Sequence, residues 1–147
     1  MSLSPHLHFK GNCGEAFAFY ADTFGGSIEM AMKYGESPAA AQTSPEFRDQ
    51  IIHARVNLNG QLLMGCDAPP ERYQAPQGFN VIAQVRDVTD AERIFNALAR
   101  DGQVLMPFQE TFWAHRFGMC TDRFGIPWMI NCEKPLAAPG GGARGNA

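Results

Sequence analysis

The sequence contains little charge, and no region of it is strongly basic. Only 18% of the residues are charged, where soluble domains average about 25%. Three lysines and nine arginines are scattered along the chain, and the net charge is −3. Nucleic-acid-binding domains carry a basic face, and proteins that bind membrane surfaces often carry a polybasic run. We therefore expect no nucleic-acid partner and no membrane partner.

Long apolar runs are also missing. The longest uninterrupted one covers residues 16–21, whereas a membrane-spanning helix needs about 20 residues. Residues 1–9 lack the cationic start and apolar stretch of a secretory signal. These two observations predict a cytoplasmic protein.

Cysteines are few and widely spaced, at positions 13, 66, 120 and 132, with no CxxC pair. This spacing favours free, buried thiols over disulfides or a zinc knuckle. Cys66 and Cys120 have no neighbouring base that would lower a thiol pKa. We expect both to be structural thiols instead of nucleophiles.

The short motifs of many enzyme classes are absent. The sequence has no glycine-rich phosphate loop, no GxSxG and no HExxH. A doubly wound methyltransferase would need a glycine-rich turn after its first parallel strand, and residues 3–14 do not supply one. The protein is therefore predicted not to be a methyltransferase.

What remains is the composition of one folded domain. The 147 residues are 45% hydrophobic and 11% aromatic, which suits a single domain with a substantial core. Residues 1–134 are predicted to form that domain. Residues 135–147 are rich in proline, glycine and alanine and are predicted to be a flexible tail.

The domain divides into two similar halves, about 3–67 and 79–133, each predicted to run strand–helix–strand–strand–strand. In the first half the strands are expected at 3–9, 27–34, 51–58 and 61–66. Asn12 is a candidate cap for the helix, Gly25 ends it, and Asn59-Gly60 joins a hairpin. In the second half the strands are expected at 79–85, 103–106, 115–121 and 127–132. Its helix begins at Asp87, Thr89 or Asp90.

Two of these strands have a mixed-polarity face. Residues 51–58 alternate so that His53, Arg55 and Asn57 share one side, and residues 79–85 place Asn80 and Gln84 together. A sheet with helices on one side and a part-polar concave face on the other is a candidate ligand site.

Three segments resemble the PhnB-like family of the vicinal oxygen chelate superfamily, which also includes glyoxalase I and bleomycin-resistance proteins. They are residues 5–13 (PHLHFKGNC), 110–115 (ETFWAH) and 121–131 (TDRFGIPWMIN). The resemblance implies an α+β fold in which two βαβββ modules form a curved mixed sheet around a concave pocket. It also implies a homodimer.

Enzymes of that superfamily hold one divalent metal with His or Glu side chains from four strand positions. Aligned through the resemblance, these positions fall on Pro5, Met64, Asn80 and Met129. None of these is a usual ligand for a hard or borderline cation except the weak amide oxygen of Asn80. We therefore expect no metal at the family's position and no resident cofactor.

Two histidines are candidates for catalysis or ligand contact. His53 lies beside Arg55 and is either a base or ligand contact, or a hydrogen-bonded strand residue. His115 follows Trp113 and precedes Arg116, a group that is either a stacking and charge clamp or a dimer contact.

His6 and His8 share a strand face and would bind metal only if a third ligand arrived from another strand, with Asp67 or Glu133 as candidates. Trp128 is predicted to fill the core or the pocket wall, with Asn131 as its polar partner.

Three functions remain open. The first is a metal-free small-molecule-binding protein, with the predicted ligand-binding residues His53, Arg55, Asn80, Trp113, His115, Arg116, Met129 and Asn131. The second is a lyase, isomerase or dioxygenase that uses a relocated metal or a His53/His115 acid–base pair. The third is a structural or regulatory homodimer whose pocket is filled by Trp128, Phe117 and methionines.

Overall fold

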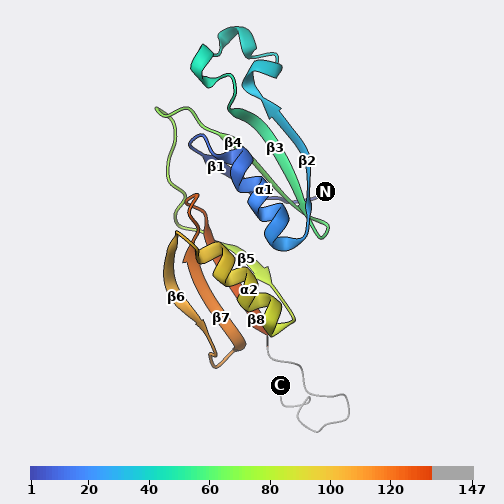
Figure 1. Ribbon diagram of the computed structural model, residues 1–147, viewed down its shortest axis with the longest axis vertical. Coiled ribbons are helices and arrows are strands. Elements are labelled where there is room, and N and C mark those ends of the chain that lie inside the picture. Colours follow the sequence, from blue (N-terminus) through green and yellow to red (C-terminus); the bar gives the residue numbers. More distant parts are fainter. Residues whose placement is uncertain (134–147) are drawn as a thin grey trace.

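The computed structural model describes residues 1–133, so the predicted tail at 135–147 lies outside the described residues. The chain forms two βαβββ modules that lie end to end along the long axis of the molecule (Figure 1). The predicted α+β fold is confirmed. The strands form two four-stranded mixed sheets, one in each module.

The first module contains β1 (His6–Phe9), α1 (Cys13–Phe24), β2 (Ser27–Lys33), β3 (Ile51–Leu58) and β4 (Gln61–Asp67). Its sheet has the order β1-β4-β3-β2. β1 runs parallel to β4, and the other two pairs are antiparallel. The segment between β2 and β3 contains three short 3₁₀ turns, at Tyr34–Glu36, Ala40–Gln42 and Pro45–Phe47.

The second module contains β5 (Val81–Gln84), α2 (Val88–Ala99), β6 (Gln103–Gln109), β7 (Ala114–Thr121) and β8 (Pro127–Glu133). The order β5-β8-β7-β6 repeats the arrangement of the first sheet. β5 is parallel to β8, and the remaining pairs are antiparallel.

Local sequence signals explain several element ends. Asn59 and Gly60 both have positive φ, at 55° and 86°, as the predicted two-residue hairpin turn requires. Gly25 ends α1 in the left-handed conformation, with φ 76°. Asp87 begins α2, and its carboxylate accepts a 2.8 Å hydrogen bond from the Asp90 N–H.

The cap of α1 differs from the prediction. Asn12 occupies the N-cap position, but its side chain makes no capping hydrogen bond. The buried carboxylate of Asp67, at the end of β4, accepts bonds from the N–H groups of Gly11 and Cys13, both at 2.9 Å. Its second oxygen accepts a 2.8 Å bond from the Ile51 N–H. A long-range contact therefore replaces the expected local cap.

One continuous cluster of buried side chains joins the two modules. The Tyr20 ring of α1 packs on Trp128 of β8 with the ring centroids 5.3 Å apart. The buried Asp122 carboxylate accepts hydrogen bonds from both the Tyr20 hydroxyl and the Trp128 indole N–H. Trp128 is a core residue, as one predicted alternative held. The prediction of Asn131 as its partner is wrong, because Asp122 takes that role.

Each helix covers one face of its own sheet, and both helices lie on the same side of the molecule (Figure 1). We call the opposite face of β1–β4 the first open face and that of β5–β8 the second open face. Most side chains on these faces are partly or fully exposed in the single chain, with Phe117 and Asn131 as buried exceptions, and most of those on the helix-covered faces are buried. The open faces are where a ligand or a second chain would meet the sheets.

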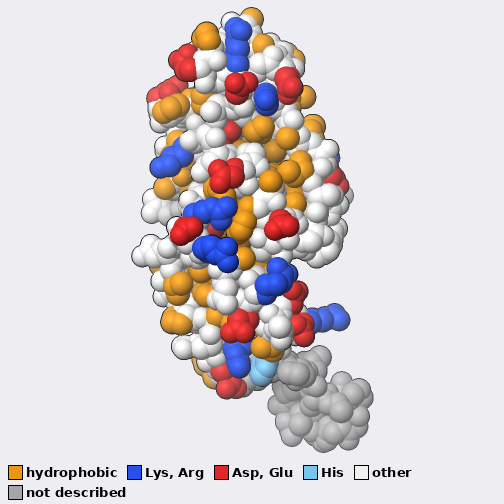
Figure 2. Space-filling view, in the orientation of Figure 1, with side chains coloured by type: hydrophobic (Ala, Val, Ile, Leu, Met, Phe, Trp, Pro, Cys, Tyr) orange, Lys and Arg blue, Asp and Glu red, His pale blue; other side chains and the backbone are white. Residues whose placement is uncertain are grey.

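The surface on the helix side carries no dominant charge of one sign. Basic and acidic side chains lie interspersed there (Figure 2). No helix among the described residues is long and apolar enough to cross a membrane.

Candidate functional site

The first open face gathers imidazole, sulfur and guanidinium groups. Strand register places Met30, Arg55, Met64 and His6 in one row across the four strands. The next row holds the pairs Met32–His53 and His8–Cys66. The alternate residues of the same strands, such as Leu7, Ala54 and Leu63, turn to the core and are buried. Period-two alternation therefore exposes this set as a whole.

Three of the chain's four histidines converge on this face. The His6 ring centroid lies 5.0 Å from that of His8 and 6.3 Å from that of His53. Partial burial, followed by the neighbouring His8 and His53, lowers the pKa of His6. The neutral imidazole is therefore favoured at neutral pH, and this is the form that accepts a proton or ligates a metal.

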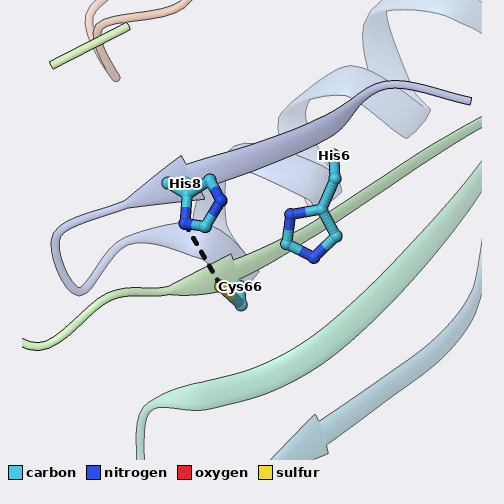
Figure 3. A group of neighbouring side chains, drawn as sticks. All are labelled: His6, His8 and Cys66. Atoms are coloured by element: carbon cyan, nitrogen blue, oxygen red, sulfur yellow. Dashed lines mark hydrogen bonds between the residues drawn. The ribbon is translucent and has the colours of Figure 1, made fainter. Parts of the chain in front are cut away.

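Cys66 lies directly beside this histidine group. Its Sγ is 3.7 Å from Nδ1 of His8 (Figure 3). The third group predicted near His6 and His8 was Asp67 or Glu133. Asp67 instead points to the α1 N-terminus, and Glu133 ends β8 in the other module.

All four cysteines are free thiols, as predicted. Cys13, Cys120 and Cys132 are buried, and burial raises the pKa of Cys120 to about 12. The prediction of a buried thiol is wrong for Cys66, which is partly exposed. Burial of part of its side chain still raises the pKa of Cys66, with Asp67 adding to the effect.

The Arg55 side chain lies on the first open face, and one of its nitrogen atoms has no hydrogen-bond partner in the described residues. Its guanidinium lies 3.9 Å from the Glu29 carboxylate, at a part-exposed site. Its Nε is buried and has no hydrogen-bond partner within residues 1–133. Buried donors without partners are uncommon in folded proteins, and the Arg55 side chain as a whole is part-exposed on this face.

A cavity of about 470 Å³ adjoins this face, between β1 and the segment that links the two modules. His6, Leu7 and His8 form one wall. The linker supplies the other wall, with the side chains Arg72, Gln74, Ala75, Pro76, Gln77 and Phe79. These linker residues were not predicted from the sequence, since no periodic pattern covers them and their position against β1 depends on the tertiary fold.

The second open face is more apolar. Ile82 and Met129 are register partners on it, as are Gln84 and Asn131. The Asn131 amide donates a 2.7 Å hydrogen bond to the Gln84 side chain, while its own Oδ1 is buried without a partner in the described chain. Asn80 directly precedes β5 and has the same strand parity as Ile82.

The predicted clamp of Trp113, His115 and Arg116 is not assembled in this chain. Trp113 is 47% exposed and packs edge-on against Phe117, whose register partner is Asn131 of the second open face. Arg116 instead pairs in register with Cys132, a core residue, and donates to the His115 carbonyl. The indole and the guanidinium therefore lie on different sides of the second sheet.

His53 and His115 are likewise separated between the modules. His53 is on β3 of the first sheet and His115 is on β7 of the second. The predicted ligand-binding residues as a whole divide between the two sheets, with His53 and Arg55 on the first.

The four positions that correspond to the family's metal site do not fit a metal ion. Pro5 offers no side-chain donor, and Met64 lies on the first open face. Asn80 and Met129 belong to the second module, and of these only Asn80 offers an oxygen. Two thioethers and one neutral amide are poor ligands for hard or borderline divalent ions.

The start of α1 does not offer an anion site either. Helix N-termini bind phosphate through free backbone N–H groups. In this chain the Asp67 carboxylate already accepts from the Cys13 N–H at the helix start and from the Gly11 N–H just before it. A nucleotide phosphate would meet a buried negative charge at that position.

Known proteins resemble this chain in both sequence and structure. Protein YjdN of Escherichia coli K12 is 42% identical over 142 residues, which cover 91% of this chain and 97% of YjdN. The crystal structure of protein PA1353 from Pseudomonas aeruginosa is also 42% identical. It superposes with a TM-score of 0.84 over 92% of this chain and 99% of its own.

A third relative carries the family's name. A putative 3-demethylubiquinone-9 3-methyltransferase, PhnB protein, from Bacillus cereus is 25% identical, with a TM-score of 0.78 over 90% of this chain and 99% of its own. The fosfomycin resistance protein FosX of Listeria monocytogenes shares the fold, with a TM-score of 0.63 at 10% identity over 91% of this chain and 94% of its own.

A family model described as 3-demethylubiquinone-9 3-methyltransferase matches residues 1–131. The match spans both modules, and the solved relatives share their arrangement. The chain therefore belongs to this family, the PhnB-like family of the vicinal oxygen chelate superfamily.

Proposed function

We propose that the protein binds a small molecule at the first open face, in the cavity between β1 and the linker. The observation that carries this proposal is the cavity itself, about 470 Å³, with His6 and His8 on one wall and Arg72 and Phe79 on the other. Cavities of 300–1,000 Å³ are the usual size for small-molecule sites, and apolar walls with a few polar groups are their usual lining.

The lining indicates the class of ligand. Arg72 is a fixed positive charge whose planar guanidinium suits a carboxylate or another oxyanion. Phe79 is 44% exposed, and an aromatic ring in that position stacks on flat or apolar groups. The imidazoles of His6 and His8 add hydrogen-bonding nitrogens. The site therefore suits a small anion that also carries a ring or another apolar group.

The proposal includes a homodimer. The second open face leaves Ile82 49% exposed and Trp113 47% exposed, and Phe112 beside it is 89% exposed. Apolar side chains gathered on one sheet face favour burial against a partner. A second copy, in the cytoplasm expected from the sequence, would cover this face and bring the remaining predicted ligand-binding residues toward a ligand.

A second candidate function is an enzyme that uses the histidines of the first open face. The convergence of His6, His8 and His53 favours it, since acid–base catalysis needs imidazoles close to one reacting atom. It requires two of these rings within about 3 Å of the same ligand atom. The family's methyltransferase label would suit a doubly wound parallel sheet, whereas the described strands form two four-stranded mixed sheets.

One contact argues against the third function, a structural or regulatory homodimer whose pocket is filled by side chains. Trp128 was expected to fill the pocket in that hypothesis, but its side chain is buried in the core against Tyr20. It therefore does not contribute to the wall of the cavity beside β1.

The proposal is tested with three probes that separate charge from apolar character. Benzoate has both a negative charge and an aromatic ring. Acetate has the charge without the ring, and benzyl alcohol has the ring without the charge. We expect benzoate to bind most tightly, at about millimolar Kd for a fragment of this size. Arg72→Ala should weaken benzoate about tenfold, because it removes one charge-assisted hydrogen bond.

Arg100→Ala is the matched control, since Arg100 is an exposed arginine that directly follows α2 and does not line the cavity. Its benzoate affinity should equal that of the unmodified protein. Equal affinity for all three probes, or equal weakening by both substitutions, would contradict the proposed site.

A further inference from the structure

The backbone pairing of β1 with β4 fixes a group of three potential metal ligands. The parallel register sets His8 opposite Cys66 and His6 opposite Met64. Leu7 and Phe9 on the other face are 1% and 0% exposed. The core therefore holds β1 in a register that leaves both imidazoles and the Cys66 thiol on the first open face (Figure 3).

The ligand atoms are close to the spacing that a metal ion requires. One nitrogen from each histidine and the Cys66 sulfur all lie within 4.8 Å of one another. With metal–nitrogen bonds of ~2.0–2.1 Å and a metal–sulfur bond of ~2.3 Å, ligands in a tetrahedron are about 3.3–3.6 Å apart. The separation of 3.7 Å between Cys66 Sγ and His8 Nδ1 nearly meets this value.

The exposure of these side chains leaves them free to rotate toward a shared metal ion. His6 and His8 are both exposed, and Cys66 is partly exposed. Exposed side chains change rotamer at little cost, whereas a buried pair would need the backbone to move. The strands therefore supply a rigid base, and the imidazoles supply the adjustment of about 1 Å that tetrahedral coordination requires.

We infer that His6, His8 and Cys66 form a metal site for a borderline transition-metal cation such as Zn²⁺. Two imidazoles and a thiolate are the ligands that this ion prefers, while Mg²⁺ and Ca²⁺ need oxygen donors. Three protein ligands leave the fourth coordination position open to water or to a bound molecule.

These residues differ from those at the family's metal position. The corresponding residues Pro5, Asn80 and Met129 supply no ligand set, and two of them lie in the second module. The inferred site lies wholly within the first module, on two adjacent strands. It does not rely on the proposed binding of an organic anion, although His6 and His8 also border the cavity with Arg72.

The site is tested by titrating the full chain, freed of metal with a chelator, with ZnCl₂ in a calorimeter. We expect one Zn²⁺ per chain. Binding of the metal must displace the thiol proton, so affinity should rise with pH. Cys66→Ser, His6→Ala and His8→Ala should each weaken Zn²⁺ binding by about 100-fold or more, beyond the 10–100-fold typical of losing a supporting contact.

Titration with CoCl₂ supplies an optical readout that reports the thiolate itself. The unmodified chain should develop a sulfur-to-cobalt charge-transfer band together with the visible bands of tetrahedral Co²⁺. Cys66→Ser should abolish the charge-transfer band, and circular dichroism checks that the variant remains folded.

His115→Ala is the matched control, because it removes one histidine from the second module. Its Zn²⁺ affinity should be unchanged. Retention of full Zn²⁺ affinity by Cys66→Ser and His8→Ala would overturn the inference, as would equal weakening by His115→Ala. Loss of benzoate binding with intact Zn²⁺ binding would contradict the proposed function alone.

Discussion

At the scale of single residues, Asp122 holds the two modules together. Its side chain is 3% exposed. One carboxylate oxygen accepts from the Tyr20 hydroxyl and the Trp128 indole, at 2.5 and 2.9 Å. The other accepts from the backbone N–H groups of Phe124 and Ile126. A helix of the first module and a strand of the second therefore share one buried acceptor.

Asp122→Ala should lower the free energy of unfolding by about 3–5 kcal/mol, because it leaves four donors without their acceptor at about 1–3 kcal/mol each, partly relieved by water. Urea denaturation followed by tryptophan fluorescence measures the loss. Asp90→Ala is the control, since the Asp90 carboxylate pairs with Arg93 at an exposed site. A loss no larger than that of the control would contradict this role for Asp122.

Tyr20 makes the same contact sensitive to pH. Burial, followed by the charge of Asp122, raises the pKa of Tyr20 well above its usual value. Above pH about 10 the unfolded chain releases the phenol proton while the folded chain keeps it. The folded state then binds more protons than the unfolded state, so stability falls as pH rises.

Tyr20→Phe should cost about 1–2 kcal/mol near neutral pH, through the lost hydrogen bond. The difference in unfolding free energy between the two proteins should shrink as pH rises above about 10, because only the unmodified chain carries the titrating group. Denaturation curves from pH 7 to pH 11 measure this difference. A difference that grows with pH would contradict the predicted direction of the pH dependence.

At the scale of secondary-structure elements, α1 depends on a cap that arrives from β4. The Asp67 carboxylate binds the N–H groups of Gly11, Cys13 and Ile51, and so joins the helix start to two strands. Asn12 occupies the position at which a local cap would act, yet its Oδ1 is buried without a partner in the described residues.

This arrangement inverts the usual ranking of capping mutations. Asp67→Ala should destabilise the protein by about 2–4 kcal/mol, because three backbone donors, two of them buried, lose their acceptor. Asn12→Ala should change the unfolding free energy by less than about 0.5 kcal/mol, where replacement of a working N-cap costs ~1 kcal/mol. Thermal and urea unfolding of the two variants provide the comparison. A larger loss of unfolding free energy for Asn12→Ala than for Asp67→Ala would show that Asn12 caps the helix.

Element prediction from sequence succeeded where the signals were local. The Asn59-Gly60 turn and strict alternation predicted β3 at its observed bounds, Ile51–Leu58. β6 was predicted to end at Met106, before Pro107, but it continues to Gln109. β6 is an edge strand with register shifts on both sides of Met106, and an edge strand with bulges tolerates proline.

The candidate site was predictable only in part, for a physical reason. Alternation along β1 was enough to place His6 and His8 on one face. It did not reveal Cys66, because the parallel register of β1 and β4 joins residues 58 positions apart in the chain. Arg72 and Phe79 were missed for the same reason, since the tertiary fold brings the linker to β1.

At the scale of the whole molecule, the two open faces have different chemistry. The first carries His6, His8, Arg55 and Cys66, while the second carries Ile82, Met119 and Met129. Both helices pack on the opposite side (Figure 1). A single chain therefore exposes one polar and one apolar sheet surface, which favours assembly through the apolar one.

The dimer prediction has a closely matched control. Ile82 and Val104 are 49% and 48% exposed. Ile82 pairs in register with Met129 on the second open face, whereas Val104 pairs with Cys120, a core residue, and so faces the helix side. Ile82→Asp should convert the dimer to monomers in sedimentation velocity, and Val104→Asp should not. A monomeric unmodified chain, or a dimer that survives Ile82→Asp, would contradict assembly through this face.

If the cavity beside β1 is the ligand site, a map of backbone amide chemical shifts should locate a bound ligand there. On addition of benzoate to the ¹⁵N-labelled chain, we expect the largest shifts to cluster at residues 6–8 and 72–79, the two walls of the cavity. Shifts confined to other segments, or no saturable shifts at millimolar benzoate, would contradict it.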